Sequence, residues 1–241
     1  TIDKSITLSG GWNTGFTVQD GYTTLHGGDA RRIIHIPEGV APTLERLVMT
    51  HSGDYPFVNY GTTLLRDSEI SWQDVGIENI GWLTLQRTTV KNSLSTGPFG
   101  GGINNYRDAV LRIYESTIIS NTTSTHGGGI WNEGSLMVVN STITKNIVYA
   151  NMSDSYGGGI YHAGSGLKLI NATIAYNEGG YAGGGVYGSA ILQNTMIANN
   201  SADLGPDLSG TFTSAGYNLI GDTSNAPIYS MPSDKLDVDP L

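Results

Sequence analysis

The chain has 241 residues, with 12 Lys and Arg residues against 21 Asp and Glu residues and a formal net charge of −9. No apolar run approaches the roughly 18 residues that a membrane-spanning helix needs, and the few basic residues disfavour nucleic-acid binding. Cysteine is absent, which excludes disulfides, zinc–thiolate sites and a cysteine nucleophile. Glycine contributes 34 residues and charged residues only 14%, a composition typical of turns and short strands.

Residues 1–40 begin the chain with a glycine-rich stretch, and we expect them to form the first coils or a cap of a repetitive fold. The chain starts at Thr1 without Met or a signal peptide, so we expect a processed or trimmed product. The lack of cysteine fits a secreted bacterial protein.

Residues 41–202 contain two short motifs that recur in alternation. One reads apolar-x-apolar-x-x-small-x-apolar and spans 83–90, 111–118, 136–143, 167–174 and 190–197. The other is GGGI or GGGV and spans 100–103, 127–130, 157–160 and 183–186. The last apolar residues of successive copies of the first motif, starting from Ile70, are 20 to 31 residues apart. That period suits one turn of a parallel β-helix and excludes propellers and leucine-rich repeats.

Alternation within each strand predicts which side chains enter the core. In residues 136–143 the predicted inward set is Leu136, Val138, Ser141 and Ile143, whereas Met137 and Thr142 face outward. No window shows the apolar stripe of an amphipathic helix, so helices should be nearly absent. The predicted fold is all-β: a single-stranded right-handed parallel β-helix (β-solenoid) of roughly eight to ten coils, forming one domain over residues 1–241.

Recurring Asn residues predict ladders, because equivalent residues of stacked coils lie above one another at steps of about 4.8 Å. The first predicted ladder consists of Asn121, Asn146, Asn177 and Asn200. The second consists of Asn140, Asn171 and Asn194, with Glu115 at its start. Asn suits a bend because it tolerates a left-handed backbone and its amide can bond to the next coil. We therefore expect these residues to be structural.

The pairing of GGGI with S/T-x-I-x-x-N resembles the repeats of polymorphic outer-membrane proteins. The chain is also similar to right-handed parallel β-helix surface proteins, as in Chloroflexus-like and cyanobacterial secreted proteins, through ITLSGGWNTGF (6–16) and GYNLIGDTSN (216–225). It departs from the outer-membrane family in having Ile or Val where that family has Phe. The resemblance implies a β-helix, secretion and a surface role, and it implies no catalytic residues.

Residues 203–241 lose the repeat period, and we expect an irregular C-terminal coil or cap here. Four prolines in this segment could blunt the last sheet edge, because proline cannot donate to a neighbouring strand. In the surface proteins that the chain resembles, Asp-Pro-Leu is followed by more residues, so we expect the natural chain to continue past Leu241. The Asp residues of this segment could hold calcium, but their spacing matches no calcium motif, and we expect no metal site or cofactor.

The residue after each GGGI or GGGV motif should point outward if the Ile or Val points inward. This position holds Trp131, Tyr161 and Tyr187, which predict an exposed aromatic column along the rod. Flat exposed rings can face sugar rings or a protein partner, so these three residues are the candidates for ligand binding. Alternatively, the column is a stacking ladder that only stabilises the sheet.

Acid–base catalysis would need ionisable residues in one column on neighbouring coils. The mid-chain acids fall at different phases of the coil, as do the histidines of the regular coils, His126 and His162. His162 shares its phase with Asn105 and Asn132, so we interpret it as a member of a bend ladder. A single outward column of Thr residues is too narrow for the ice-binding surface of some solenoids. Catalytic residues stay unknown.

Together these patterns favour a secreted or cell-surface module that is structural, adhesive or glycan-binding. The alternative is a polysaccharide lyase, hydrolase or epimerase on the same fold, because function resides in sites grafted on folds. A polysaccharide or a cell-surface component is the expected partner, and self-association through the rod ends is a further one. We expect no nucleic-acid partner and no membrane span.

Overall fold

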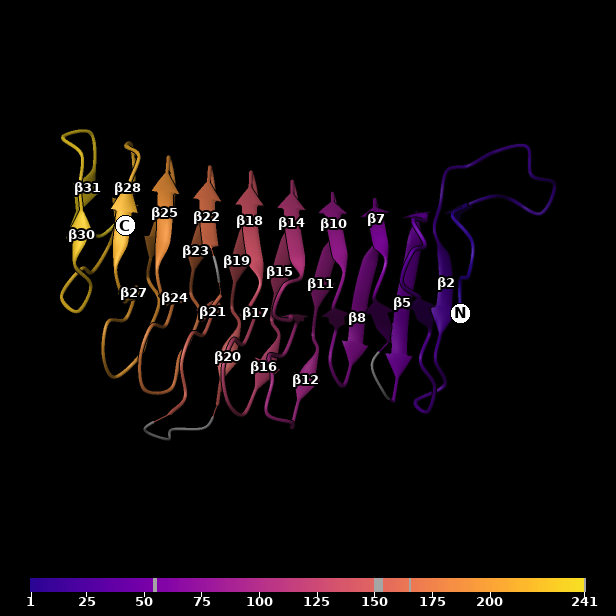
Figure 1. Cartoon of the computed structure of the whole chain (residues 1–241), viewed down its shortest axis with the longest axis horizontal. Helices are drawn as coiled ribbons and strands as arrows, with labels where there is room; N and C mark the ends of the chain where they lie inside the picture. The colour runs from indigo at the N-terminus through magenta and orange to yellow at the C-terminus, as the bar shows by residue number, and fades with distance from the viewer. Residues whose placement is uncertain (54–55, 150–153, 165, 241) are drawn as a thin grey trace.

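The computed structural model describes residues 1–53, 56–149, 154–164 and 166–240. Its strands stack as successive coils of an elongated rod (Figure 1). Every strand pair is parallel, and the described residues contain no helix, hence none that could cross a membrane. The architecture is a parallel β-helix, which confirms the predicted fold class.

Three long sheets form the faces of the rod. Sheet A contains β1 (Thr7–Ser9), β4 (Thr43–Glu45), β7 (Thr62–Arg66), β10 (Trp82–Gln86), β14 (Val110–Tyr114), β18 (Ser135–Val139), β22 (Gly166–Ile170), β25 (Ala190–Gln193), β28 (Phe212–Ser214) and β30 (Ile228–Tyr229). Sheet B contains β2 (Thr23–His26), β5 (Leu47–Ser52), β8 (Glu69–Gln73), β11 (Thr89–Lys91), β15 (Thr117–Ile119), β19 (Thr142–Thr144), β23 (Thr173–Ala175), β26 (Met196–Ala198), β29 (Leu219–Ile220) and β31 (Lys235–Leu236).

Sheet C contains β3 (Ile34–Ile36), β6 (Phe57–Asn59), β9 (Ile77–Asn79), β13 (Ile103–Asn105), β17 (Ile130–Asn132), β21 (Ile160–His162), β24 (Val186–Tyr187) and β27 (Leu208–Ser209). A short fourth sheet, sheet D, contains β12 (Leu94–Ser95), β16 (Thr122–Thr123) and β20 (Ile147–Val148). Each coil therefore runs from sheet A to sheet B and, through sheet D where it is present, to sheet C.

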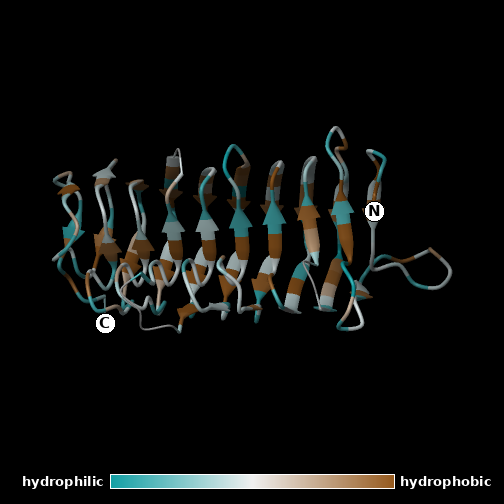
Figure 2. Ribbon diagram, turned by 60° about the horizontal axis from the view of Figure 1, so that its bottom comes forward, coloured by the Kyte–Doolittle hydropathy of each residue, from teal (hydrophilic) through white to brown (hydrophobic). Residues whose placement is uncertain are grey.

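Alternate residues of the strands enter one apolar core that runs down the rod. In β18 and β19, Leu136, Val138 and Ile143 are buried, whereas Met137 and Thr142 are half-buried on the outside, as the alternation predicted. Figure 2 shows hydrophobic residues recurring along the strands from coil to coil. The core thus follows from the repeat, because each coil places an equivalent side chain on the one below it.

The predicted second Asn ladder lies on the surface at the corner between sheets A and B. Asn171 donates its side-chain amide to Asn140 Oδ1 at 2.9 Å, and Asn194 donates to Asn171 Oδ1 at 2.7 Å. All three have a left-handed backbone with φ of +50°, +50° and +48°. Asn is suited to this corner because it adopts positive φ more readily than most residues.

The first predicted Asn ladder is buried at the next corner. Asn121, Asn146, Asn177 and Asn200 are joined in sequence by amide-to-carbonyl hydrogen bonds of 3.0, 2.9 and 2.9 Å. The ladder ends on Asp207, whose Oδ1 accepts from the Asn200 amide at 2.8 Å. Burial raises the pKa of the Asp207 carboxyl, against the lowering effect of the N–H groups that donate to it.

A further buried ladder lies at the corner between sheets C and A. Amide-to-carbonyl hydrogen bonds of 2.8, 2.7 and 2.6 Å join Asn59, Asn79, Asn105 and Asn132 in sequence. Asn132 then contacts Nδ1 of His162 at 2.6 Å. The shared phase of Asn105, Asn132 and His162 indicated this column, whereas its first two members were not predicted.

The glycine triplets supply tight corners beside the buried Asn121 ladder. The first glycine has a left-handed backbone in three of the four triplets, as in Gly127 with φ of +67°. The third glycine packs against the ladder, and a Cβ on Gly129 would lie 3.0 Å from the amide of Asn146 and 2.6 Å from the carbonyl oxygen of Gly159. The motif therefore recurs because a side chain has no room there.

Both ends of the chain add strands to the long sheets. Residues 203–240 lose the sequence period, yet they supply β27 to β31 in continuous parallel register with the earlier coils. Residues 1–40 supply β1 to β3, and the segment between β1 and β2 extends beyond the stacked coils (Figure 1). Leu241, where we expected the natural chain to continue, lies outside the described residues.

Candidate functional site

The predicted aromatic column lies on the outer side of sheet C. Trp131 of β17 pairs with Tyr161 of β21, which pairs with Tyr187 of β24. The loops before the glycine triplets fold over this side and bring His126 and Tyr156 beside the column, where they form a bridge with each other. The outer side of sheet C therefore carries two interleaved columns of rings.

The rings of the two columns stack on one another. Tyr161 and Tyr187 are nearly parallel, with centroids 5.6 Å apart, and His126 and Tyr156 are nearly parallel at 5.3 Å. Between the columns, His126 stacks on Tyr161 at 4.8 Å and Tyr156 stacks on Tyr187 at 4.4 Å. The ring faces are thus largely occupied by other rings, which stabilises this layer by about 0.5–1.5 kcal/mol for each pair.

Trp131 is buried, so the expectation that it is exposed is wrong. Its side chain is only 6% exposed, because Phe99 and Tyr106 cover it in edge-to-face contacts at 5.2 and 5.5 Å. Tyr106 is itself held by a hydrogen bond from its hydroxyl to Glu78 Oε1 at 2.9 Å. Tyr161 and Tyr187 are half-buried. The three candidates therefore belong to a packed layer and not to an open platform.

Burial keeps this aromatic layer uncharged. It raises the pKa of Tyr156 and Tyr161, and the neighbouring Tyr187 phenol adds to the shift in both. It also lowers the pKa of His126, against the opposing charge of Asp154. Both directions favour the neutral form of each ring, so the layer carries little charge near neutral pH.

A groove of about 440 Å³ lies at the corner where sheet C passes into sheet A. Its lining comes from three successive coils and includes His162, Lys168, Ser189, Ile191, Thr211 and Thr213. The groove is open at Gly166, where a Cβ would meet no atom within 4 Å. Gly164 and Gly188 lie along the same corner because the preceding coil leaves no room for a side chain: a Cβ would lie 2.1 Å from the Gly134 carbonyl oxygen and 2.2 Å from the His162 carbonyl oxygen, respectively.

The groove combines apolar and polar surface. Ile191 of β25 is 44% exposed and presents an aliphatic side chain, while Ser189, Thr211 and Thr213 present hydroxyl groups. His162 uses Nδ1 for its contact with Asn132, and burial lowers its pKa, so it takes part as a neutral ring. Lys168 of β22 contributes a positive charge from an exposed position.

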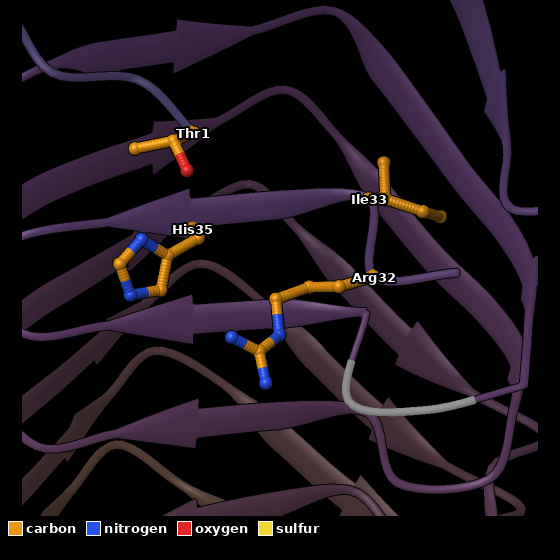
Figure 3. A pocket seen from close by; sticks show the side chains of 4 residues that line it. All are labelled: Thr1, Arg32, Ile33 and His35. Carbon is orange, nitrogen blue, oxygen red and sulfur yellow. The ribbon is translucent and has the colours of Figure 1, made fainter.

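Two other hollows share no lining residue with this groove. One of about 370 Å³ is lined by Thr1, Arg32, Ile33 and His35, and Figure 3 shows Arg32 and His35 on one side while Ile33 points away. The other, of about 300 Å³, lies beside Tyr149, Glu178 and Asp203. Within the described residues, no three His, Cys, Asp or Glu residues are grouped closely enough to hold a metal ion.

A recurring position in the sequence indicates the rings that pack against the aromatic column, although the column residues alone do not. Phe99, His126 and Tyr156 each stand directly before a glycine triplet, so an aromatic residue recurs there in three successive coils. The groove had a weaker signal, the glycine at position 166 where the preceding coil carries Ser135. Comparison of the chain with known protein families, curated proteins and solved structures gave no match.

Proposed function

We propose that the chain is a glycan-binding module of a secreted or cell-surface bacterial β-helix protein, and that the groove over residues 162–213 is its binding site. The observation that carries this proposal is the lining of the groove, where the exposed aliphatic side chain of Ile191 lies among the hydroxyls of Ser189, Thr211 and Thr213. A sugar ring has apolar C–H faces and a rim of hydroxyls, so it matches both kinds of surface.

The direction of the groove supports a polymeric ligand. Three successive coils line it, and the coils advance by about 4.8 Å along the rod. An extended chain lying along the rod therefore meets equivalent backbone positions on each coil. This arrangement suits an adhesive module that holds a polysaccharide or another cell-surface component.

The aromatic layer supports the neighbouring groove in this proposal. The ring faces of Tyr161 and Tyr187 are stacked against other rings, and Trp131 is covered. Tyr187 directly precedes Gly188, which occupies the position of His162 in the next coil. Its stacked ring thus stabilises β24, the strand that directly precedes the groove-lining residues Ser189, Ala190 and Ile191.

The repeat motifs support the setting of the proposed function. GGGI with S/T-x-I-x-x-N resembles the repeats of polymorphic outer-membrane proteins and of secreted bacterial β-helix surface proteins. That resemblance favours an extracellular or cell-surface location and an adhesive role. The resemblance does not identify a ligand, so the proposal of a glycan rests on the lining of the groove.

A variant with a large side chain in the groove tests whether the ligand binds there. Gly166 lines the groove, and a Cβ built on it meets no atom within 4 Å, so Gly166→Trp should place a ring in the groove without disturbing the fold. On an array of neutral and acidic glycans, the wild-type chain should bind a subset and Gly166→Trp should lose that binding. The matched control is Gly97→Trp, at an open glycine between β12 and β13, which should bind normally.

Two results would contradict the proposal. Binding that survives Gly166→Trp unchanged would place the site elsewhere on the rod. Release of new reducing ends from a bound polysaccharide would favour the lyase or hydrolase alternative over a binding module, and a change in its epimer composition without cleavage would favour the epimerase alternative.

A further inference from the structure

The charges on the outer side of sheet A indicate which glycans the groove binds, and this inference rests on the function proposed above. Lys168 lies at the groove, and Arg112 occupies the same outward column two coils earlier, with Met137 between them. Both cationic side chains are exposed. Sheet A thus aligns two positive charges along the rod.

These two cations have no acidic partner among the described residues, in contrast to Arg66, Arg87 and Lys91. Within the described residues, Arg66 pairs with Glu45, Arg87 with Asp67 and Glu115, and Lys91 with Glu69. Neither Arg112 nor Lys168 forms an ion pair in the same part of the structure. Their charges are therefore available to a ligand.

The surface around these cations carries unusually few acids for a chain with a net charge of −9. No strand of sheet A from β7 to β30 contains Asp or Glu, and none of the described groove residues is acidic. Acids occur instead at the corners, such as Asp108 and Glu133 between sheets C and A, and on sheets B and C. A positive strip therefore crosses an acidic protein along one sheet.

We infer that the groove and the adjoining strip of sheet A bind a polysaccharide that carries carboxylates, a polymer of uronic acids. One carboxylate pairs with Lys168 at the groove, and a second pairs with Arg112, whose planar guanidinium can bind both oxygens. The two cations are two coil steps apart, or about 10 Å along the rod. A polymer with regularly spaced charges can therefore contact both, while its sugar faces lie on Ile191 and Met137.

Paired probes test the charge of the ligand. We suggest calorimetric titration of the chain with pectate, alginate and hyaluronate oligosaccharides and with the carboxyl-reduced form of each. At least one uronate should bind, and its reduced form should bind about tenfold or more weakly, as expected for loss of a charged hydrogen bond. Added salt should weaken the uronate complex, because the contacts are exposed and screened.

Three variants assign the effect to the two cations. Lys168→Gln and Arg112→Gln should each weaken uronate binding by about tenfold, a much larger loss than for the reduced oligosaccharide. Lys168→Arg should restore most of the affinity. The matched control is Lys145→Gln, which removes an exposed cation beyond sheet B and should change nothing.

The outcomes separate this inference from the proposed function. Equal binding of uronates and their reduced forms, lost in Gly166→Trp, would overturn the inference and leave glycan binding intact. Tighter binding of a sulfated polysaccharide than of any uronate would also overturn the assignment to carboxylates. Lack of binding to every oligosaccharide, neutral or acidic, would overturn both.

Discussion

Asn132 donates its side-chain amide to Nδ1 of His162 across 2.6 Å, and this contact ends a ladder of four buried Asn residues. The ladder has one direction, because Asn105 donates to Oδ1 of Asn132 at 2.6 Å and leaves the Asn132 amide as the donor. Nδ1 of His162 must therefore accept, which places the proton of the neutral ring on Nε2. A second proton on Nδ1 would set two donors against each other.

This geometry predicts that acid weakens the fold through His162. Burial lowers the pKa of His162 in the folded chain, whereas the unfolded residue has a pKa of about 6.5. As the pH drops below this value, the unfolded state binds more protons than the folded state. The free energy of unfolding therefore decreases as the pH is lowered, and it levels off below the folded pKa. Urea unfolding between pH 8 and 5 measures this loss.

His162→Asn should remove part of the pH dependence, since Asn occupies the preceding four positions of the ladder. His126, whose pKa burial also lowers, should account for a second part, and the double variant His162→Asn with His126→Asn should be nearly flat over this range. If the free energy of unfolding of His162→Asn depends on pH as steeply as that of the wild-type chain, the contact of His162 with Asn132 does not contribute to the pH dependence.

The two predicted Asn ladders should differ in their contribution to stability. Asn177 is fully buried, and its amide accepts from Asn146 and donates to Asn200 and to the Ile143 carbonyl. Asn177→Ala should lower the free energy of unfolding by about 1–3 kcal/mol, because these groups lose their partners without access to water. Chemical denaturation measures the loss.

The matched control is Asn171→Gly in the exposed ladder, where glycine keeps the left-handed backbone and water replaces the lost bonds. Its cost should be well below that of Asn177→Ala. Similar losses in both variants would contradict the distinction between the buried and the exposed ladder.

The repeat predicted the core and the buried ladders because both depend on position within a coil. Leu136, Val138 and Ile143 follow from the period-2 alternation of their strands, and Asn121 and Asn146 follow from the spacing after it. In a β-helix the next coil repeats the same position at a fixed step, so register alone determines these contacts. The alignment of Trp131 with Tyr161 was predictable for the same reason.

The burial of Trp131 was not predictable from its register. It depends on Phe99 and Tyr106, which lie in connections of variable length outside the strands. The groove at residues 162–213 depends likewise on the corner loops, where Gly166 leaves open space. The period of the repeat determines where a strand lies, whereas the loops determine which of its outward residues meet solvent.

The third glycine of each triplet should be intolerant of any side chain. A Cβ on Gly159 would lie 2.6 Å from the Gly185 carbonyl oxygen and 3.1 Å from the Asn177 amide, so backbone must move to admit it. Gly159→Ala should therefore lower the melting temperature clearly. Gly166→Ala is the matched control, because a Cβ there meets no atom within 4 Å, and it should be neutral or slightly stabilising through the unfolded state.

Differential scanning calorimetry of the two alanine variants compares them directly. Equal melting temperatures would show that the coil can separate at the triplet, and the steric explanation of the GGGI motif would then fail.

Trp131 should contribute to stability and not to ligand contact. Its ring is enclosed by Phe99 and Tyr106, so Trp131→Ala should leave a cavity and lower the free energy of unfolding by about 3–5 kcal/mol. Tyr187→Ala should cost less, because the Tyr187 ring is half-buried at the end of its stack. Near-ultraviolet circular dichroism and urea unfolding of both variants measure the difference. A stable Trp131→Ala chain that has lost glycan binding would return Trp131 to the binding surface, whereas an unstable chain whose folded fraction still binds would confirm its place in the packed layer.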